Sequence, residues 1–397
     1  MTAPDAHDPQ SERPGRIMCR EMAEQPEALR RLLDEGAPLI HGTADRVAAQ
    51  RPRFVLLTGR GTSDHAALYA KYLLEVRLGL PCGLTSMSTV TAYGARPDLR
   101  DVLAVTVSQS GGSPDLVAST RAAREAGAIT VAVTNNPDSP LAAVAEHHID
   151  ILAGPERAPA TKSYTSALLA LYLFIERLGE RLREGLEEGL REGPEEGPEE
   201  GSEEGAEEDD RSPSLSPSPP SSSPSPAAPL PALAAGLLAR QDEIKALAAR
   251  YRFADRMVLT SRGYGYPTAM EAALKLMETS YISALAYSGA DLLHGPLAMV
   301  DNISPVIAVV PDGRGGEALG PVLERLRGRG ADLVVVGPKA QVEQASAGFV
   351  LPTDGVPEEL QPILEIIPLQ LLAYEVTIAR GHDPDAPRAL AKVTETR

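Results

Sequence analysis

The sequence of 397 residues contains no tryptophan, and aromatic residues make up only 4% of it. Its hydrophobic cores must therefore be built mainly from Leu, Val, Ile and Ala. The two cysteines, Cys19 and Cys82, cannot form a disulfide framework. Cys82 follows a proline in an apolar run, so we expect it to pack in a core. His and Cys residues nowhere share the spacing of metal ligands, and we predict neither a metal nor another cofactor.

An excess of positive charge is also missing, because the formal net charge is −17. Most of this charge is local: the segment from Glu184 to Asp210 holds fourteen acidic residues and one basic residue. The remainder of the chain is near neutral, which gives nucleic-acid binding no electrostatic support. The polar N-terminus lacks the apolar core of a signal peptide, and no apolar run is expected to span a membrane. We therefore expect a cytoplasmic protein that binds neither nucleic acid nor membrane.

What the chain does contain is a regular alternation of strand-like and helix-like segments. Helical patterns cover residues 17–35, ending at Gly36, and residues 161–179, and others separate the strands. Such alternation is typical of βαβ units that form a parallel sheet with helices on both faces. The strands predicted in this first half are Phe54–Thr58, 83–87, 102–107 and 130–134.

The composition changes abruptly after this unit. Residues 184–210 are Glu/Gly repeats and residues 211–231 are Ser/Pro repeats, and neither kind of segment buries enough apolar surface to offset its ordering entropy. We interpret residues 184–228 as a disordered acidic and Pro/Ser-rich linker and residues 1–15 as a disordered arm. The predicted domains are then residues 16–183 and 229–381, followed by a C-terminal tail at 382–397.

The second domain repeats the pattern of the first. The run Met257-Val258-Leu259-Thr260-Ser261-Arg262-Gly263 parallels Val55-Leu56-Leu57-Thr58-Gly59-Arg60-Gly61, and both lead into Ala/Leu/Lys-rich helices. We interpret the chain as two tandem α/β domains with doubly wound parallel sheets. The second copy has Pro311-Asp312-Gly313 where the first has Ser108-Gln109-Ser110. We therefore expect one ligand site per chain, built mainly from the first domain.

Two turns of the first domain place hydroxyl and glycine residues directly after predicted strands. In a parallel sheet both turns lie at the carboxyl edge, where ligands bind, and the start of a helix favours an anion. Either turn alone is more often an ordinary Ser/Gly turn, but two at one edge favour a site for a small anion such as a sugar phosphate. Lys162 is either a further contact or an ordinary solvated lysine. The predicted phosphate-binding residues are Gly61, Thr62, Ser63, Ser108, Gln109, Ser110 and Ser113.

In the second domain Glu271, Lys275 and Glu278 share one face of a predicted helix. A surface ladder of salt bridges is the ordinary interpretation of such spacing. The neighbouring residues are apolar on nearly every side, however, so the charges should face a cleft or pair with each other. Glu278 is then a candidate base. His294, which precedes Gly295-Pro296, is either structural or a group that exchanges protons near neutral pH.

Five segments in order carry a family resemblance: Gly59-Arg60-Gly61-Thr62-Ser63-Asp64-His65-Ala66, Ser108-Gln109-Ser110-Gly111, Glu271-Ala272-Ala273-Leu274-Lys275-Leu276-Met277-Glu278, His294-Gly295-Pro296-Leu297 and Arg388-Ala389-Leu390-Ala391-Lys392. They resemble the double sugar-isomerase (SIS) proteins, which include the isomerase half of glucosamine-6-phosphate synthase and the SIS-type glucosamine-6-phosphate deaminases. The resemblance covers both domains and implies flavodoxin-like folds. It also implies a homodimer with a shared active site and a phosphorylated amino sugar as the ligand.

The resemblance also implies catalytic roles for four residues. Glu278 matches the base that moves a proton between C1 and C2, and Lys275 is its neighbour. His294 matches a group that assists ring opening and that comes from the partner subunit in the synthase. Lys392 matches a tail lysine near the carbonyl end of the sugar.

The chain departs from the synthase in ways that affect the expected reaction. We identify no glutaminase segment in it, so we do not expect glutamine-dependent synthesis. Ser113-Pro114-Asp115 is more similar to the deaminase branch, and Met277 stands where the synthase has a lysine. Ser283 and Leu285 replace a His and a Glu beside the sugar.

Three functions remain open from the sequence. The first hypothesis is an isomerase/deaminase that converts glucosamine 6-phosphate to fructose 6-phosphate and ammonia. The second is a dehydratase (lyase) that acts on N-acetylglucosamine 6-phosphate with the same base. The third is a sugar-phosphate sensor without catalysis.

Overall fold

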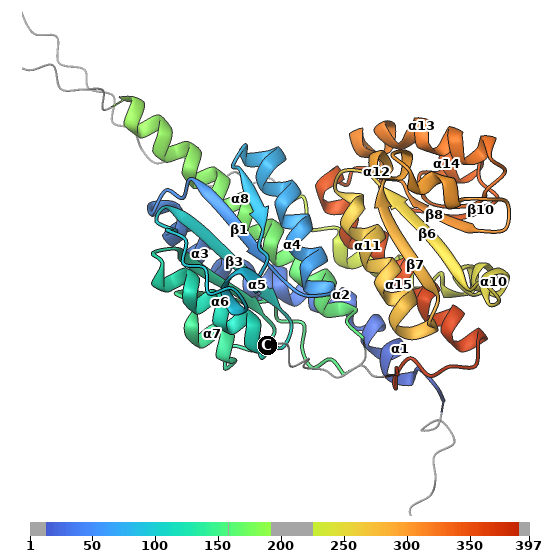
Figure 1. Ribbon diagram of the computed structural model, residues 1–397, viewed down its shortest axis with the longest axis horizontal. Coiled ribbons are helices and arrows are strands. Elements are labelled where there is room, and N and C mark those ends of the chain that lie inside the picture. Colours follow the sequence, from blue (N-terminus) through green and yellow to red (C-terminus); the bar gives the residue numbers. More distant parts are fainter. Residues whose placement is uncertain (1–12, 158, 192–224, 389–397) are drawn as a thin grey trace, which may run out of the picture.

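Each half of the chain forms a five-stranded parallel sheet, and Figure 1 shows the two sheets with the helices around them. The computed structural model describes residues 13–157, 159–191 and 225–388. The first sheet has the order β2-β1-β3-β4-β5 and the second the order β10-β9-β8-β6-β7. Written from β7 to β10, the second order is β7-β6-β8-β9-β10, which corresponds strand for strand to the order of the first sheet. The strands are β1 Phe54–Thr58, β2 Cys82–Leu84, β3 Val102–Ser108, β4 Ile129–Thr134, β5 His147–Asp150, β6 Arg256–Ser261, β7 Ser283–Ser288, β8 Pro305–Val309, β9 Asp332–Gly337 and β10 Ala347–Val350.

Helices cover both sheets, and we call each sheet with its helices a lobe. In the first lobe α3 and α4 pack on α8, and in the second α10 and α11 pack on α15. The lobes meet through contacts of α4 with α11 and of α8 with α15. The helices are α1 Arg16–Ala23, α2 Gln25–Arg31, α3 Ala37–Ala49, α4 Thr62–Leu73, α5 Ser88–Thr91, α6 Pro114–Glu125, α7 Pro140–Val144, α8 Lys162–Arg191, α9 Leu230–Leu238, α10 Gln241–Tyr251, α11 Gly265–Lys275, α12 Gly289–Leu293, α13 Arg314–Gly328, α14 Lys339–Val342 and α15 Gln361–Ala379.

Short turns of π- and 3₁₀-helix extend several of these helices. π-Helical turns at Leu74–Leu78 and Leu276–Ser280 follow α4 and α11, so the two lobes share this detail as well. Another π-helical turn, Leu32–Gly36, joins α2 to α3, and 3₁₀ turns lie at Pro296–Met299 and Glu358–Leu360. The repeated α4 and α11 arrangement supports the interpretation of a duplicated domain.

The order of strands places the two predicted turns side by side. In the first sheet β1 lies between β2 and β3, and Thr58 at the end of β1 pairs with Thr106 near the end of β3. The chain therefore leaves β1 and β3 at neighbouring points of the same edge. This is the topological switch point, where ligands bind in open α/β sheets, including those of the flavodoxin-like order found here.

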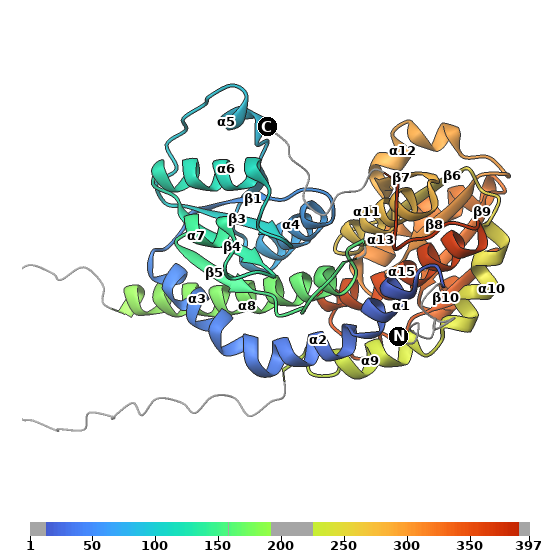
Figure 2. The same ribbon diagram turned by 90° about the horizontal axis from the view of Figure 1, so that it is seen from below.

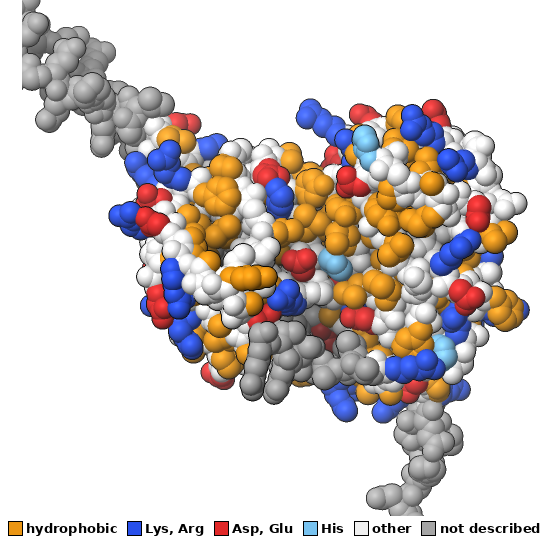
Figure 3. Space-filling model, in the orientation of Figure 1, with side chains coloured by type: hydrophobic (Ala, Val, Ile, Leu, Met, Phe, Trp, Pro, Cys, Tyr) orange, Lys and Arg blue, Asp and Glu red, His pale blue; other side chains and the backbone are white. Residues whose placement is uncertain are grey.

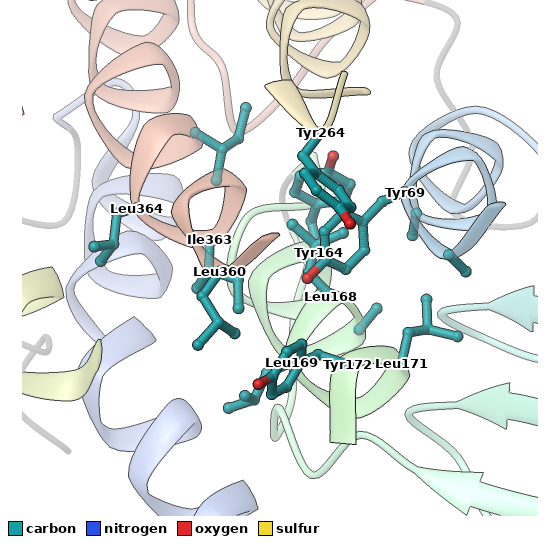
Figure 4. Packing of buried hydrophobic residues seen from close by; sticks show 14 of the residues in the cluster. Tyr69, Tyr164, Leu168, Leu169, Leu171, Tyr172, Tyr264, Leu360, Ile363 and Leu364 are labelled. Atoms are coloured by element: carbon teal, nitrogen blue, oxygen red, sulfur yellow. The ribbon is translucent and has the colours of Figure 1, made fainter. Parts of the chain in front are cut away.

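Buried tyrosines and aliphatic residues fill the junction of the lobes (Figure 4). Tyr69 of α4 and Tyr164 of α8 are both fully buried there, beside Tyr264 and the start of α15. The Tyr69 hydroxyl donates a hydrogen bond of 2.6 Å to the Glu359 carbonyl oxygen of the other lobe. Apolar side chains also gather along this junction at the surface (Figure 3). The junction is thus a continuous apolar core that holds the lobes together.

The N-terminal helix α1 packs on the second lobe, as Figure 2 shows. Asp383 accepts a hydrogen bond from the Gly15 N–H, and Asp385 accepts two, from the N–H groups of Ile17 and Met18, at distances of 2.7–2.8 Å. Carboxylates at this end of a helix satisfy orphan donors and complement the helix dipole. The last segment of the chain therefore caps its first helix.

The structure confirms the α/β class and most predicted elements but corrects several boundaries. Gly36 does not end a helix, because the chain continues through a π-helical turn into α3. The helix predicted at 161–179 runs to Arg191, so the linker cannot begin at residue 184. Residues 225–228 form a turn, and residues 192–224 of the predicted linker and 1–12 of the predicted arm lie outside the described residues.

One helical segment, Glu358–Ala379, is long and apolar enough to cross a membrane, which the sequence analysis did not expect. In the folded protein, 83% of the most apolar 18-residue stretch of this segment is buried. It is the central helix of the second lobe, and its apolar composition reflects burial on all sides.

Candidate active site

The turn after β3 supplies hydroxyl groups at the start of α6. The Ser108 Oγ accepts a hydrogen bond of 3.1 Å from the Gly111 N–H, and the Ser110 Oγ accepts one of 3.3 Å from the Gly112 N–H. In these contacts each hydroxyl acts as the acceptor, so its own proton remains to be donated to an anion. Gly111 has φ +64°, and a Cβ there would stand 2.2 Å from Ser139 Oγ. Only glycine allows the turn to pack this closely on α7.

The turn after β1 is linked to this helix by an ion pair. Arg60 donates two hydrogen bonds of 2.8 and 2.9 Å to Asp115, which is buried in the first turn of α6. The Leu116 N–H also donates to Asp115. The pair joins the two turns and leaves the serine hydroxyls as neutral donors at the edge of the sheet.

The three charged residues of the second lobe form a buried cluster and not a surface ladder. The side chains of Glu271, Lys275 and Glu278 are 0%, 1% and 17% exposed. Lys275 Nζ lies 3.3 Å from Glu271 and 2.6 Å from Glu278 Oε2. Burial disfavours the lysine cation, but its two carboxylate neighbours outweigh burial and raise the pKa of Lys275. Burial likewise opposes ionisation of Glu271, yet Lys275 and His65 lower the pKa of this carboxyl.

Hydrogen bonds connect this cluster to the first lobe at the start of α4. The Thr62 hydroxyl donates to Glu271 at 2.9 Å and accepts from Lys275 at 3.1 Å, and His65 Nδ1 lies 2.7 Å from Glu271. Thr62 was predicted to bind phosphate, but its hydroxyl is already engaged on both sides. It connects the turn after β1 to the lysine that pairs with Glu278, and its contact with phosphate stays a prediction.

The candidate base stands where the C-terminal tail returns to the second lobe. Glu278 lies in the π-helical turn Leu276–Ser280, three residues before Tyr281. The Arg388 N–H donates a 2.9 Å hydrogen bond to the Tyr281 hydroxyl, and the Arg388 guanidinium lies 4.4 Å from the centre of its ring. Lys392, the predicted tail lysine, lies outside the described residues.

The remaining predicted residues differ in their surroundings. Ser63, Gln109 and Ser113 are partly exposed at the same edge as Ser108, and Gly61 adopts φ +54° before α4. His294 is exposed at the C-terminal end of α12. The described contacts do not connect it to the Glu278 cluster within one chain. Lys162 is neither solvated nor a candidate anion contact, because it is 1% exposed and paired with Glu24.

The sequence pattern indicated no role for His65 and no contact of Glu271 with the first lobe. His65 follows Thr62 by three residues, so the two share a face of α4. That spacing was a usable signal for a common partner. The partner itself could not be identified, because it comes from a helix about two hundred residues away.

A model of the SIS domain family matches the chain twice, at residues 50–177 and 251–380. Glutamine–fructose-6-phosphate aminotransferase [isomerizing] from Pyrococcus horikoshii is 32% identical over 384 residues, which are 95% of this chain. The chain spans only 57% of the length of that relative.

Two solved structures are similar over nearly their whole length. A candidate phosphosugar isomerase from Silicibacter pomeroyi DSS-3 is 31% identical, with a TM-score of 0.74 over 93% of this chain and 99% of that chain. The C-terminal domain of glucosamine-fructose-6-phosphate aminotransferase from Francisella tularensis is 25% identical, with a TM-score of 0.75 over 96% and 99%. With both lobes matched by the family model, this chain belongs to the SIS domain family and carries two SIS domains.

Proposed function

We propose that the protein is a sugar-phosphate isomerase that acts on a phosphorylated amino sugar and releases its amine as ammonia. The observation that carries this proposal is the contact of Lys275 with both Glu278 and Thr62. Lys275 thereby holds the Glu278 carboxylate, the proposed base, beside the turn that begins α4. This turn lies at the edge of the first sheet where ligands bind in open α/β folds. The sugar-phosphate names of the relatives support the same substrate class.

The phosphate group is proposed to bind at the turn after β3. Ser108 and Ser110 have protons to donate, and the start of α6 adds the positive end of its dipole. Ser63, Gln109 and Ser113 are proposed as further contacts at the same edge. Because the donors are neutral hydroxyl and amide groups, they suit a phosphate monoester that must be released after each turnover.

Proton transfer is assigned to the second lobe. Once the ring of the sugar is open, Glu278 removes the proton at C2, and negative charge develops on the oxygen at C1. Lys275 is a buried cation beside Glu278, so it is placed to stabilise that charge. Protonation of C1 by Glu278, together with transfer of one proton from the C2 nitrogen to the C1 oxygen, gives an imine at C2, which water hydrolyses to a ketose phosphate and ammonia.

Two further groups are proposed to complete the site. His294 is exposed and assists ring opening in the active site of a partner subunit, as the family resemblance implies. Lys392 is proposed to act at the carbonyl end of the sugar, as the family resemblance implies. The His294 assignment requires a homodimer with a shared site, and sedimentation analysis of the full chain tests that requirement.

Turnover of two substrates separates the candidate functions. The full chain is incubated with glucosamine 6-phosphate and, separately, with N-acetylglucosamine 6-phosphate. Ammonia and fructose 6-phosphate from the first substrate support the proposal. An unsaturated, ultraviolet-absorbing product from the second would show a dehydratase, and tight binding without any turnover would show a sensor.

A further inference from the structure

One face of α4 supplies polar contacts from the first lobe to the second. Thr62, His65 and Tyr69 lie three and four residues apart, so they share this face. The Tyr69 hydroxyl donates to the backbone oxygen of Glu359 and so joins the lobes without involving the charged cluster. Thr62 and His65 both contact the carboxylate of Glu271, whose side chain is 0% exposed. The cluster that contains the proposed base is therefore attached to the first lobe by two side chains.

His65 is the donor in its contact with Glu271. Its Nδ1 lies 2.7 Å from Glu271 Oε2. Burial opposes ionisation of this carboxyl, but Lys275 and His65 lower its pKa, so it is ionised at neutral pH. An ionised carboxylate can only accept hydrogen bonds, and Nδ1 must therefore carry a proton. Hydrogen bonds to an ionised acceptor are stronger than those between neutral groups.

The two oxygens of Glu271 have different partners. Oε1 accepts a hydrogen bond of 2.9 Å from the Thr62 hydroxyl and lies 3.3 Å from Lys275 Nζ. Among the described residues, only His65 forms a hydrogen bond with Oε2. If His65 lost its donor, Oε2 would be a buried charged oxygen without a partner, which is costly. Lys275 is the cation beside the same carboxylate, and it also lies 2.6 Å from Glu278.

We propose that His65 is a positioning residue, which holds Glu271 so that Lys275 stays at Glu278. The inference rests on the proposed function, in which Glu278 is the base. Without the His65 donor, Lys275 moves toward Glu271 and its contact with Glu278 lengthens. Removal of the C2 proton then slows, because the base and the cation leave their places. The phosphate, proposed to bind at the turn after β3, is held as before, so kcat falls without a matching rise in KM.

Steady-state kinetics of the full chain with glucosamine 6-phosphate tests the proposal. His65→Leu removes the donor, and His65→Asn restores one, because the asparagine amide nitrogen can occupy the place of Nδ1. We expect kcat of His65→Leu to fall about 10–100-fold, since displacement of catalytic groups by about 1 Å costs up to about 100-fold. KM should stay unchanged. His65→Asn should recover most of the wild-type kcat, and because asparagine does not titrate, this recovery would assign the effect to the donor and not to the charge of the ring.

Tyr69→Phe is the matched control for a loss of contact between the lobes. It removes one hydrogen bond from the same face of α4 to the second lobe, at an oxygen outside the cluster. Phenylalanine keeps the ring in the core, so kcat and KM should match the wild type. A double variant tests the route through Glu271. In a Glu271→Gln background, His65→Leu should lower kcat no further, because the effects of residues in direct contact are not additive.

A kcat for folded His65→Leu equal to that of the wild type would overturn the proposal. So would an equal fall in Tyr69→Phe, no recovery in His65→Asn, or a further loss in the Glu271→Gln background. Should His65→Leu fail to fold, His65→Phe keeps a ring without the donor, and the same fall in kcat is required. A wild-type protein that does not turn over glucosamine 6-phosphate rejects the proposed function itself, and this inference falls with it.

Discussion

The two lobes share one strand order yet treat the same edge of the sheet in opposite ways. Each has a glutamate in the segment between its last strand and its last helix. In the first lobe Glu156 caps its own helix, since it accepts the N–H groups of Thr161 and Ser163 at 3.0 and 3.1 Å. In the second lobe Glu358 reaches across to α13. The two glutamates thus cap different helices, and the edge where Glu358 reaches α13 corresponds to the edge of the first lobe that is proposed to bind the phosphate.

The lobes also differ in where they place buried charge. The first lobe contributes neutral hydroxyls, and its Arg60–Asp115 pair is exposed on the arginine side. The second lobe buries an ionised cluster around Lys275. The proposed function therefore divides binding and proton transfer between the two copies of one fold, and the variants below test this division.

The largest effect is expected from loss of the base in the second lobe. Glu278→Gln should lower kcat by about 10²–10⁴-fold, the usual contribution of general acid–base catalysis. Phosphate binding by the first lobe should persist. Solvent-deuterium incorporation at C2 of the sugar measures the proton transfer directly, with Glu317→Gln, a change at an exposed acid of α13, as the control. Undiminished incorporation in Glu278→Gln would remove this residue from the mechanism.

Replacement of Lys275 in α11 should lower the free energy of unfolding far more than replacement of Lys71 in α4. Lys275→Met leaves Glu271 buried without its cation, and we expect a loss of about 3–5 kcal/mol in the free energy of unfolding. Lys71 of α4 pairs with Glu75 near the surface, so Lys71→Met should cost less than about 1 kcal/mol. Urea denaturation of both variants measures the difference. Equal losses would show that the Lys275 cluster is not held as the structure describes.

Loss of a hydroxyl in the first lobe should weaken substrate binding. Ser110→Ala removes one proposed hydrogen bond to a charged phosphate, worth about 1.5–3 kcal/mol, so KM should rise at least tenfold. Ser288→Ala serves as the comparison, since Ser288 caps α12 in the second lobe. That variant should lower the melting temperature slightly and leave KM unchanged. A KM for Ser110→Ala equal to that of the wild type would show that the phosphate does not bind at this turn.

A pH effect on stability should arise in the second lobe from Glu365 of α15. Burial raises the pKa of Glu365 from its ordinary 4.5 to about 8, with Thr268 opposing and Glu358 adding to the rise. Between these values the folded state binds more protons than the unfolded state, so stability falls as the pH rises through this window. From pH 7 to pH 8 the wild type should lose about 1 kcal/mol more than Glu365→Gln. Parallel urea titrations of the two proteins would contradict this.

The smallest effect is expected from the segment that joins the lobes. Replacement of residues 192–224 by a Gly/Ser segment of equal length removes most of the acidic and Pro/Ser-rich repeats, which we propose to be a spacer because of their composition, and keeps the span between Arg191 and Ser225. The lobes contact each other directly, so kcat/KM should change less than about twofold. A steady-state assay checks this, and a tenfold loss would assign the segment a role in the site.

The sequence was sufficient to predict the repeated α/β pattern and the position of two Ser/Gly turns at one edge of the first sheet, because both depend on local periodicity and turn residues. It also placed Glu271, Lys275 and Glu278 together, since their spacing on one helix fixes their proximity. It could not predict that Thr62 and His65 contact Glu271, or that Glu358 caps α13. Those contacts depend on how the lobes and loops pack, and residue spacing within one element carries no information about that packing.

The caps that Asp383 and Asp385 provide to α1 have a practical consequence for anyone handling this protein. Truncation before residue 383 would strip the first helix of its acceptors, although the cut is made at the opposite end of the chain. Trimming that removes residues 13–18 and trimming that removes residues 383–385 therefore break the same set of hydrogen bonds.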